Sequence, residues 1–269
     1  MQKGRDVRRH RTDPSYGDYR SGDHPSRHRS LRRWIPLLLL ALSTPALAAD
    51  YTTSFPAAEN PISEAGRWVN GGATGGSWSN VVTVPGFARG TQTGVGGYND
   101  SLAVLTGSWG PDQTASATVR TQNQPGGNVF EEVELLLRFS ITSGNARGYE
   151  VNFSINKGYA QVVKWLGPLG SFSYVDSRGI GVLHTGDVVK ATVTGNPPTF
   201  SLYINNVLQY TVTDTMANPY TTGNPGMGFY FQTDGSGGAV TDYGFTSYSA
   251  TDGTSGSLPG APSNLQVTP

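Results

Sequence analysis

Between residues 129 and 166, large apolar side chains fall on every second position of successive segments. They occupy the odd positions from Val133 to Ile141 and again from Tyr149 to Ile155. Neighbouring side chains of a β-strand point to opposite faces, so this spacing gives each segment one apolar face and one polar face. The pattern predicts half-buried antiparallel strands in this part of the chain.

Similar segments extend on both sides, separated by short clusters of Gly, Asn, Pro and Asp. Asn205-Asn206 and Lys157-Gly158 are suited to two-residue hairpin turns because Asn and Gly tolerate positive φ. After Leu47 no segment shows helical spacing of apolar residues over the length of a helix. The sequence therefore predicts an all-β sandwich or barrel, with strands at about 77–84, 101–106, 115–121, 129–141, 149–156, 159–166, 188–194, 200–204, 207–213, 227–232 and 240–248.

Residues 1–48 have the layout of an export signal. A basic stretch ends at Arg32-Arg33, an apolar run follows from Trp34 to Leu42, and residues 46–48 (ALA) offer small residues for cleavage near Ala48. A membrane span needs about 18 apolar residues, which is more than this run supplies. A twin-arginine signal is a weaker alternative. We expect the mature protein to be secreted, with no transmembrane segment.

The end of the chain has a different composition. Residues 250–260 are rich in Gly, Ser, Thr and Asp, which predicts a flexible linker. Residues 259–268 resemble the opening strand of a fibronectin type III domain, which would begin at residue 261 and continue beyond residue 269. A plain polar tail is the alternative. The resemblance implies that the chain is part of a larger multi-domain protein.

The formal charge of zero hides an acidic mature region. Residues 50–269 carry 9 basic and 15 acidic residues, a net charge of −6. Nucleic acids and anionic membrane surfaces require a basic face, so neither is expected as a partner. The chain has no cysteine, so neither disulfides nor thiolate metal sites contribute to its stability.

The chain resembles the concanavalin A-like lectin/glucanase superfamily, which includes laminin G-like modules. The resemblance rests on Phe55 and on residues 60–68 (NPISEAGRW), 133–139, 148–153 (GYEVNF), 185–191 (TGDVVKA), 202–206, 226–229 (GMGF) and 242–245 (DYGF). It implies an antiparallel jelly-roll β-sandwich of two sheets over residues 49–249. The superfamily contains binding proteins and enzymes, so the function has to be inferred from sites.

Evidence for catalysis is incomplete. Laminarinase-type members place three acids at alternate positions of one strand, and Glu132 and Glu134 match two of them. Position 136 is Leu and position 130 is Phe, so one role has no residue, and a solvated strand face is the alternative for both acids. His184 lies at a predicted turn, and no Gly-x-Ser-x-Gly motif is present. Arg138 and Tyr230 fit the residue set of alginate-lyase-type relatives only in part.

Relatives in this superfamily often hold a structural calcium near the chain termini. Asp50 and Asp242, together with Asp252, are the corresponding candidates here, although no calcium-loop spacing surrounds them. Ordinary turn aspartates are the alternative. No other cofactor is expected.

The polar face of the predicted strands favours glycan binding. Its planar hydrogen-bonding groups suit ligands rich in hydroxyls, and Trp165 and Tyr174 could stack on sugar rings. The expected ligand-binding residues are Arg138, Glu150, Asn152, Trp165, Tyr230 and Gln232. The alternative is an ordinary solvent-facing side of the sandwich, which is polar in any such fold and binds no ligand.

The sequence thus favours a secreted, lectin-like module that recognises an extracellular polysaccharide. A glycoside hydrolase or polysaccharide lyase of the same fold is the second hypothesis, and a structural or adhesive spacer is the third. The sequence favours binding over catalysis without deciding between them.

Overall fold

A computed structural model describes residues 48–95 and 97–253. The predicted basic leader and apolar run, and the segment that resembles a fibronectin type III domain, lie outside the described residues. Within the described residues, no helix has the length and apolar character needed to cross a membrane.

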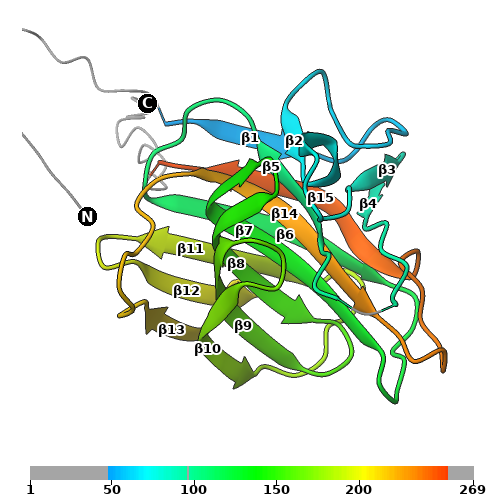
Figure 1. The fold of residues 1–269 in the computed structure, drawn as a ribbon. Coiled ribbons are helices and arrows are strands. Elements are labelled where there is room, and N and C mark those ends of the chain that lie inside the picture. Colours follow the sequence, from blue (N-terminus) through cyan, green and yellow to red (C-terminus); the bar gives the residue numbers. More distant parts are fainter. Residues whose placement is uncertain (1–47, 96, 254–269) are drawn as a thin grey trace, which may run out of the picture. The chain divides into compact units, whose positions relative to one another are not determined.

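Fifteen strands form two antiparallel sheets, which Figure 1 shows as two layers. We call the sheet with strand order β10-β9-β8-β7-β14-β5-β2 the cleft sheet and the sheet with order β13-β12-β11-β6-β15-β4-β3 the back sheet, in which β1 also pairs with β15. The strands are β1 (Asp50–Thr53), β2 (Trp68–Asn70), β3 (Val82–Val84), β4 (Phe87–Arg89), β5 (Ser101–Leu105), β6 (Gln113–Thr121), β7 (Phe130–Thr142), β8 (Asn145–Ser154), β9 (Tyr159–Gly167), β10 (Phe172–Gly179), β11 (Val188–Thr194), β12 (Thr199–Ile204), β13 (Val207–Thr213), β14 (Asn224–Gln232) and β15 (Tyr243–Thr251). A single 3₁₀ turn, Gly72–Thr74, is the only helical element among the described residues.

The predicted all-β sandwich is confirmed, and most predicted strands are present within a few residues of their bounds. The turn at Asn205-Asn206 joins β12 to β13 with positive φ at both residues, 53° and 63°. The sequence missed β10, an edge strand whose side chains are all partly or fully exposed and show no apolar alternation. It also missed β1, β2 and β4, which are too short for a period to be recognised.

The main core lies between the two sheets. Odd positions of β7 and β8, among them Leu135 and Val151, are fully buried there with back-sheet residues such as Val189 and Leu202. This arrangement agrees with the alternation read from the sequence. The first two residues of the predicted linker also belong to the sandwich, since β15 extends to Thr251 and Ala250 is buried.

A second apolar cluster covers part of the outer face of the cleft sheet. Trp78 and Trp165 meet edge to face with ring centroids 5.8 Å apart, and Phe172 packs beside Trp165. Because of this cover, β7 and β8 are buried on both faces over most of their length. The alternative of a solvated strand face for Glu132 and Glu134 is therefore wrong: their relative exposures are 7% and 0%.

Candidate functional site

Strand register brings acidic and amide side chains together on the outer face of the cleft sheet. Glu132 of β7 lies between Tyr230 of β14 and Ser154 of β8. The next pair on the same face places Glu134 opposite Asn152, which in turn lies opposite Gln161 of β9. Directly paired residues of neighbouring strands point to the same face, so these side chains form adjacent rows.

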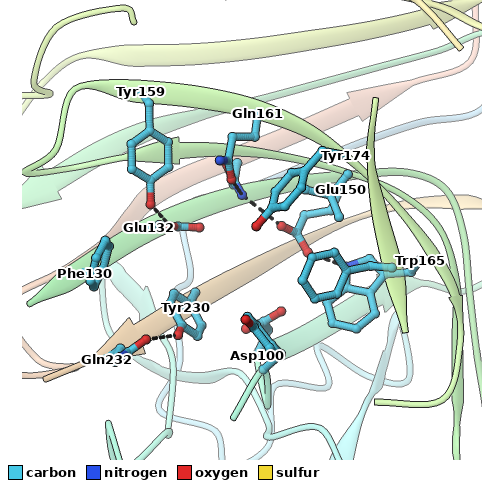
Figure 2. A pocket seen from close by; sticks show the side chains of 14 residues that line it. Asp100, Phe130, Glu132, Glu150, Tyr159, Gln161, Trp165, Tyr174, Tyr230 and Gln232 are labelled. Carbon is cyan, nitrogen blue, oxygen red and sulfur yellow. Dashed lines mark hydrogen bonds between the residues drawn. The ribbon is translucent and has the colours of Figure 1, made fainter. Parts of the chain in front are cut away.

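Four residues of these rows, Glu132, Tyr230, Asn152 and Gln161, line a cleft of about 290 Å³, shown in Figure 2. Tyr98 and Tyr174 are about half exposed at its opening, at 48% and 54% of their surface. The lining contains no Lys or Arg. It consists of aromatic rings, carboxyls and amides, with one valine: Tyr98, Asp100, Phe130, Glu132, Glu150, Asn152, Tyr159, Gln161, Val163, Trp165, Phe172, Tyr174, Tyr230 and Gln232.

Glu132 is the acid on one side of the cleft. The hydroxyl of Tyr159 donates a hydrogen bond to its carboxyl group, as Figure 2 shows. Burial raises the pKa of Glu132 to about 8, although the Tyr159 hydrogen bond acts in the opposite direction. A carboxyl group of this kind keeps its proton near neutral pH and can donate it.

Glu150 lies across the cleft and is held by two donors. The indole N–H of Trp165 donates to Glu150 Oε2 at 2.6 Å, and Nδ2 of Asn152 donates to Oε1 at 3.2 Å. Burial raises its pKa to about 7, while both hydrogen bonds favour the ionised form and lower it. The donors fix the orientation of this carboxyl group.

Asp100 and Glu134 complete an acidic group with Glu150. Asp100 precedes β5 and lines the cleft, whereas Glu134 is fully buried and outside the lining. Burial, followed by repulsion from Glu150, raises the pKa of both groups well above the ordinary range. Both carboxylate oxygens of Glu134, and Oδ1 of Asp100, have no hydrogen-bond partner.

Glycine makes room for Glu134 on β14. A Cβ atom at Gly228, its register neighbour, would collide with Oε2 of Glu134. One oxygen from each of Asp100, Glu134 and Glu150 lies within 4.8 Å of the other two. These three carboxyls could hold a cation, share protons, or accept hydrogen bonds from a hydroxylated ligand.

The structure brings most of the predicted ligand residues together. Glu150, Asn152, Trp165, Tyr230 and Gln232 all line the one cleft. Whether they bind a ligand stays a prediction. The two weak catalytic candidates lie in different places: Glu132 lines the cleft, whereas Glu134 is buried outside its lining.

Arg138 is not on this face, contrary to the sequence interpretation. A bulge between Leu137 and Ser140 shifts the register of β7, and Arg138 has a positive φ of 47°. Its side chain is 1% exposed. Its backbone N–H donates to Oε1 of Gln113 at 2.7 Å, beside the side-chain network.

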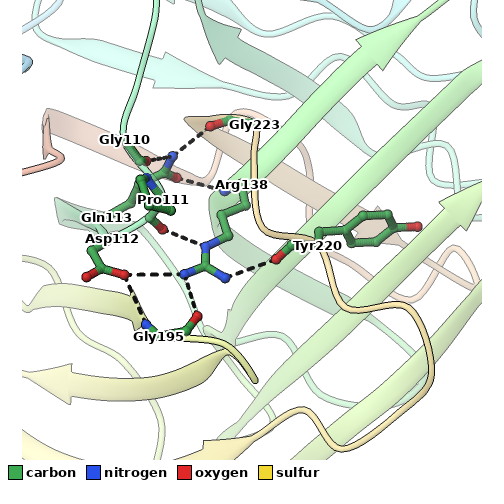
Figure 3. A network of polar contacts seen from close by, with 8 residues as sticks. All are labelled: Gly110, Pro111, Asp112, Gln113, Arg138, Gly195, Tyr220 and Gly223. Carbon is green, nitrogen blue, oxygen red and sulfur yellow. Dashed lines mark hydrogen bonds and ion pairs between the residues drawn. The ribbon is translucent and has the colours of Figure 1, made fainter.

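Figure 3 shows the polar network that holds the Arg138 guanidinium. Nε donates to the Pro111 carbonyl at 2.5 Å, and Nη1 donates to the Tyr220 carbonyl at 3.0 Å. Nη2 donates to the Gly195 carbonyl at 2.9 Å and lies 3.4 Å from Oδ1 of Asp112. The residue ties β7 to three loops, which is a structural role.

The predicted calcium ligands Asp50 and Asp242 do not form one site. Asp50 pairs with Thr251 at one end of β15, whereas Asp242 precedes Tyr243 at the other end. Asp242 accepts a hydrogen bond of 2.7 Å from Nδ2 of Asn123. The third candidate, Asp252, accepts from the backbone N–H groups of Ala49 and Gly110.

Sequence reasoning missed several residues of the cleft. Asp100 follows a loop, and Gln161 and Tyr159 come from a strand whose partners are set by sheet register. Positions 130 and 136 of the same strand carry no acid, and the acids that lie near Glu134 are Asp100 and Glu150, from other elements. Glu150 was visible as a polar residue of an alternating strand, but no sequence signal marked Asp100.

No protein-family model matches this chain, and no curated protein matches it. Similar solved structures include the carbohydrate-binding module CBM66 from Bacillus subtilis, 16% identical over 65% of this chain and 97% of that one, with a TM-score of 0.45. The metal-free carbohydrate recognition domain of Emp46p is 11% identical over 76% and 97%, with a TM-score of 0.47. An endo-1,3-beta-glucanase from Streptomyces sioyaensis is 12% identical over 78% and 98%, with a TM-score of 0.43. At these identities and TM-scores the likeness assigns neither a family nor a ligand to this chain.

Proposed function

We propose that the cleft binds a carbohydrate, and that the chain acts as an exported glycan-binding module of a larger protein. The observation that carries this proposal is the cleft itself, in which exposed aromatic rings stand beside buried carboxyl and amide groups. Rings can stack on the apolar face of a sugar, and planar polar groups can bond its hydroxyls. Export and the multi-domain setting are supported by the sequence features alone.

The charge of the cleft narrows the class of glycan. Asp100, Glu132 and Glu150 line it, and no basic side chain does. An anionic polysaccharide would find no basic side chain among the lining residues to compensate its charge. We therefore expect a neutral sugar unit, small enough to enter a cleft of about 290 Å³.

Retention on a panel of neutral and anionic polysaccharides, followed by calorimetry on the best ligand, tests this proposal. Tyr174→Ala removes an exposed ring from the cleft and should weaken binding about 10-fold. Tyr203→Ala is the matched control, because Tyr203 lies on β12 of the back sheet, beside Lys190. Equal binding by wild type and Tyr174→Ala, or no retention on any polysaccharide, would contradict the proposal and favour a spacer role.

Glycoside hydrolysis is the second candidate, and Glu132 is the observation that favours it. Its carboxyl group has a pKa raised to about 8 by burial, as a general acid requires, and it shares the cleft with Glu150. Reducing ends released by the wild type, and lost in Glu132→Gln with binding intact, would replace the binding proposal with this one. Binding without product release would exclude it for the glycans tested.

A further inference from the structure

We propose that Asp100, Glu134 and Glu150 form a binding site for a divalent cation of the calcium class, beside the glycan cleft. The three carboxyls come from a loop and two strands, and an oxygen of each lies within 4.8 Å of the others. Binding of the cation itself does not depend on the proposed function. Only the part of the proposal in which the cation assists glycan binding rests on it.

Asn152 supplies an observation independent of the acidic cluster. It is 3% exposed, and its amide oxygen is buried without a hydrogen-bond partner. Its amide nitrogen donates to Glu150 Oε1 and, at 3.1 Å, to Gln161 Oε1 on the β9 side. The amide oxygen is therefore directed toward β7, where Glu134 is the register neighbour. A buried, unpartnered amide oxygen beside Glu134 is a typical additional donor for a hard cation.

Among the described residues, no Lys, Arg or His forms an ion pair with these three carboxyls. The four ion pairs among residues 48–95 and 97–253 are Arg138–Asp112, Lys164–Asp214, Arg178–Asp176 and His184–Asp187. None of them includes Asp100, Glu134 or Glu150. Three buried carboxyls without a basic partner would be costly in their ionised form, and a bound divalent ion would offset that cost.

The donor set and its size favour calcium. All donors are oxygens, which excludes the nitrogen and sulfur preferences of zinc and copper. Oxygens on opposite sides of Ca²⁺ lie about 5 Å apart, compared with about 4 Å for Mg²⁺. The three oxygens lie within 4.8 Å of one another, which has room for the longer bonds of calcium, and calcium tolerates an irregular oxygen set that the strict octahedron of Mg²⁺ does not.

Buried side chains hold the proposed site in place on one side, and its other side faces the cleft. Glu134 is fully buried, with Gly228 leaving space for its carboxyl group, and the indole N–H of Trp165 fixes the orientation of Glu150. Asp100 and Glu150 also line the cleft. Calcium takes about 6 to 8 oxygens, so hydroxyls of a sugar in the cleft can complete its coordination.

Terbium luminescence tests the site directly, because Tb³⁺ replaces calcium at oxygen sites and is excited by a nearby indole. The full chain, freed of metal with EDTA, should show one saturable Tb³⁺ site that calcium displaces far better than magnesium. Trp165→Phe should greatly reduce the emission while calorimetry still detects calcium, since the Trp165 N–H contacts Glu150. Absence of a saturable site would overturn the proposal.

Matched variants assign the site to these residues. Glu134→Gln and Asp100→Asn should each weaken Tb³⁺ and Ca²⁺ binding at least about 10-fold, which is the smallest loss typical for residues that support a metal site. Glu131→Gln is the control, because Glu131 is also a buried acid of β7 with both oxygens unpartnered, yet it lies outside the cluster. Unchanged binding in both Glu134→Gln and Asp100→Asn, with circular dichroism showing folded proteins, would contradict the assignment. Equal losses in Glu131→Gln would do the same.

Glycan retention measured with calcium and with EDTA separates this inference from the proposed function. Retention that falls at least about 10-fold in EDTA supports cation-assisted binding. Equal retention in both leaves the glycan-binding proposal standing and overturns the role of the cation. Saturable Tb³⁺ binding without retention on any glycan would overturn the proposed function and the role of the cation in it, while the metal site itself would stand.

Discussion

Strand β7 buries a cation near one end and carboxyl groups near the other. The two regions differ in how many hydrogen-bond partners the buried groups have. The Arg138 guanidinium donates to three backbone carbonyls and to the Asp112 carboxylate, from three loops, whereas neither oxygen of Glu134 has a partner among the described residues. Their exposures are almost the same, at 1% and 0%. A satisfied buried charge holds a fold together, and an unsatisfied one costs stability unless something else binds it.

The largest expected effect on stability is at Arg138, whose buried charge has hydrogen-bond partners. Arg138→Met should lower the free energy of unfolding by about 3 to 5 kcal/mol, because it leaves three backbone carbonyls without their donor. Urea denaturation monitored by circular dichroism measures this. A loss below about 1 kcal/mol would show that the network is dispensable and would erase the contrast with Glu134.

Glu131 extends the comparison to the other face of β7. Burial, and then repulsion from Asp242, raises its pKa from an ordinary 4.5 to about 7, and the nearby phenol of Tyr243 carries no compensating charge. The folded protein therefore binds more protons than the unfolded chain between these values, so stability falls as the pH rises from 4.5 to 7.

Glu131→Gln should remove the part of this pH-dependent loss of unfolding free energy that Glu131 causes, which is at most about 3 kcal/mol. The measurement is the unfolding free energy in EDTA at several pH values, compared between wild type and variant. A variant whose stability declines as steeply as that of the wild type would show that Glu131 ionises freely in the folded state.

A smaller effect of opposite sign is expected at Glu134. In EDTA, Glu134→Gln should leave stability unchanged or raise it by about 1 to 2 kcal/mol, because the neutral amide avoids the cost of burying an ionisable carboxyl group. Added calcium should raise the melting temperature of the wild type more than that of the variant. A destabilised variant in EDTA would mean that the carboxyl group is satisfied without a cation.

The smallest effect on folding is expected at the cleft opening. Tyr174→Ala should change the unfolding free energy by less than about 0.5 kcal/mol, since the ring is more than half exposed on an edge strand. Its effect should appear in glycan affinity instead. Thermal melting run beside calorimetry separates the two, and a strongly destabilised variant would assign the ring to the fold.

Much of the fold could be predicted because it depends on local alternation. The odd apolar positions of β7 and β8 placed their core faces correctly, and the Asn205-Asn206 turn fixed a hairpin. β10 could not be predicted, since an exposed edge strand needs no apolar period. The bulge at Arg138 could not be predicted either, because it depends on glycines distant in sequence: a Cβ at Gly148 or Gly223 would collide with the backbone there.

The candidate site was predictable to the extent that it follows strand alternation. Glu150, Asn152, Tyr230 and Gln232 were found because they alternate with apolar residues on their strands. Asp100 and the burial of Glu134 were not found, because they depend on a loop and on the second apolar cluster that covers the outer face. Alternation indicates which face a residue is on, but it does not reveal what covers that face.

Gly228 gives a way to sort related sequences before any experiment. Since a Cβ at this position would occupy the space of the Glu134 carboxyl group, a side chain at 228 would displace that carboxyl group from its place beside Asp100 and Glu150. Relatives that keep the acid should therefore keep the glycine, and relatives with alanine or a larger residue at 228 should carry a shorter or apolar residue at 134. The residues at positions 134 and 228 together therefore distinguish sequences that can form the acidic group of Asp100, Glu134 and Glu150 from sequences in which a side chain at 228 fills its space.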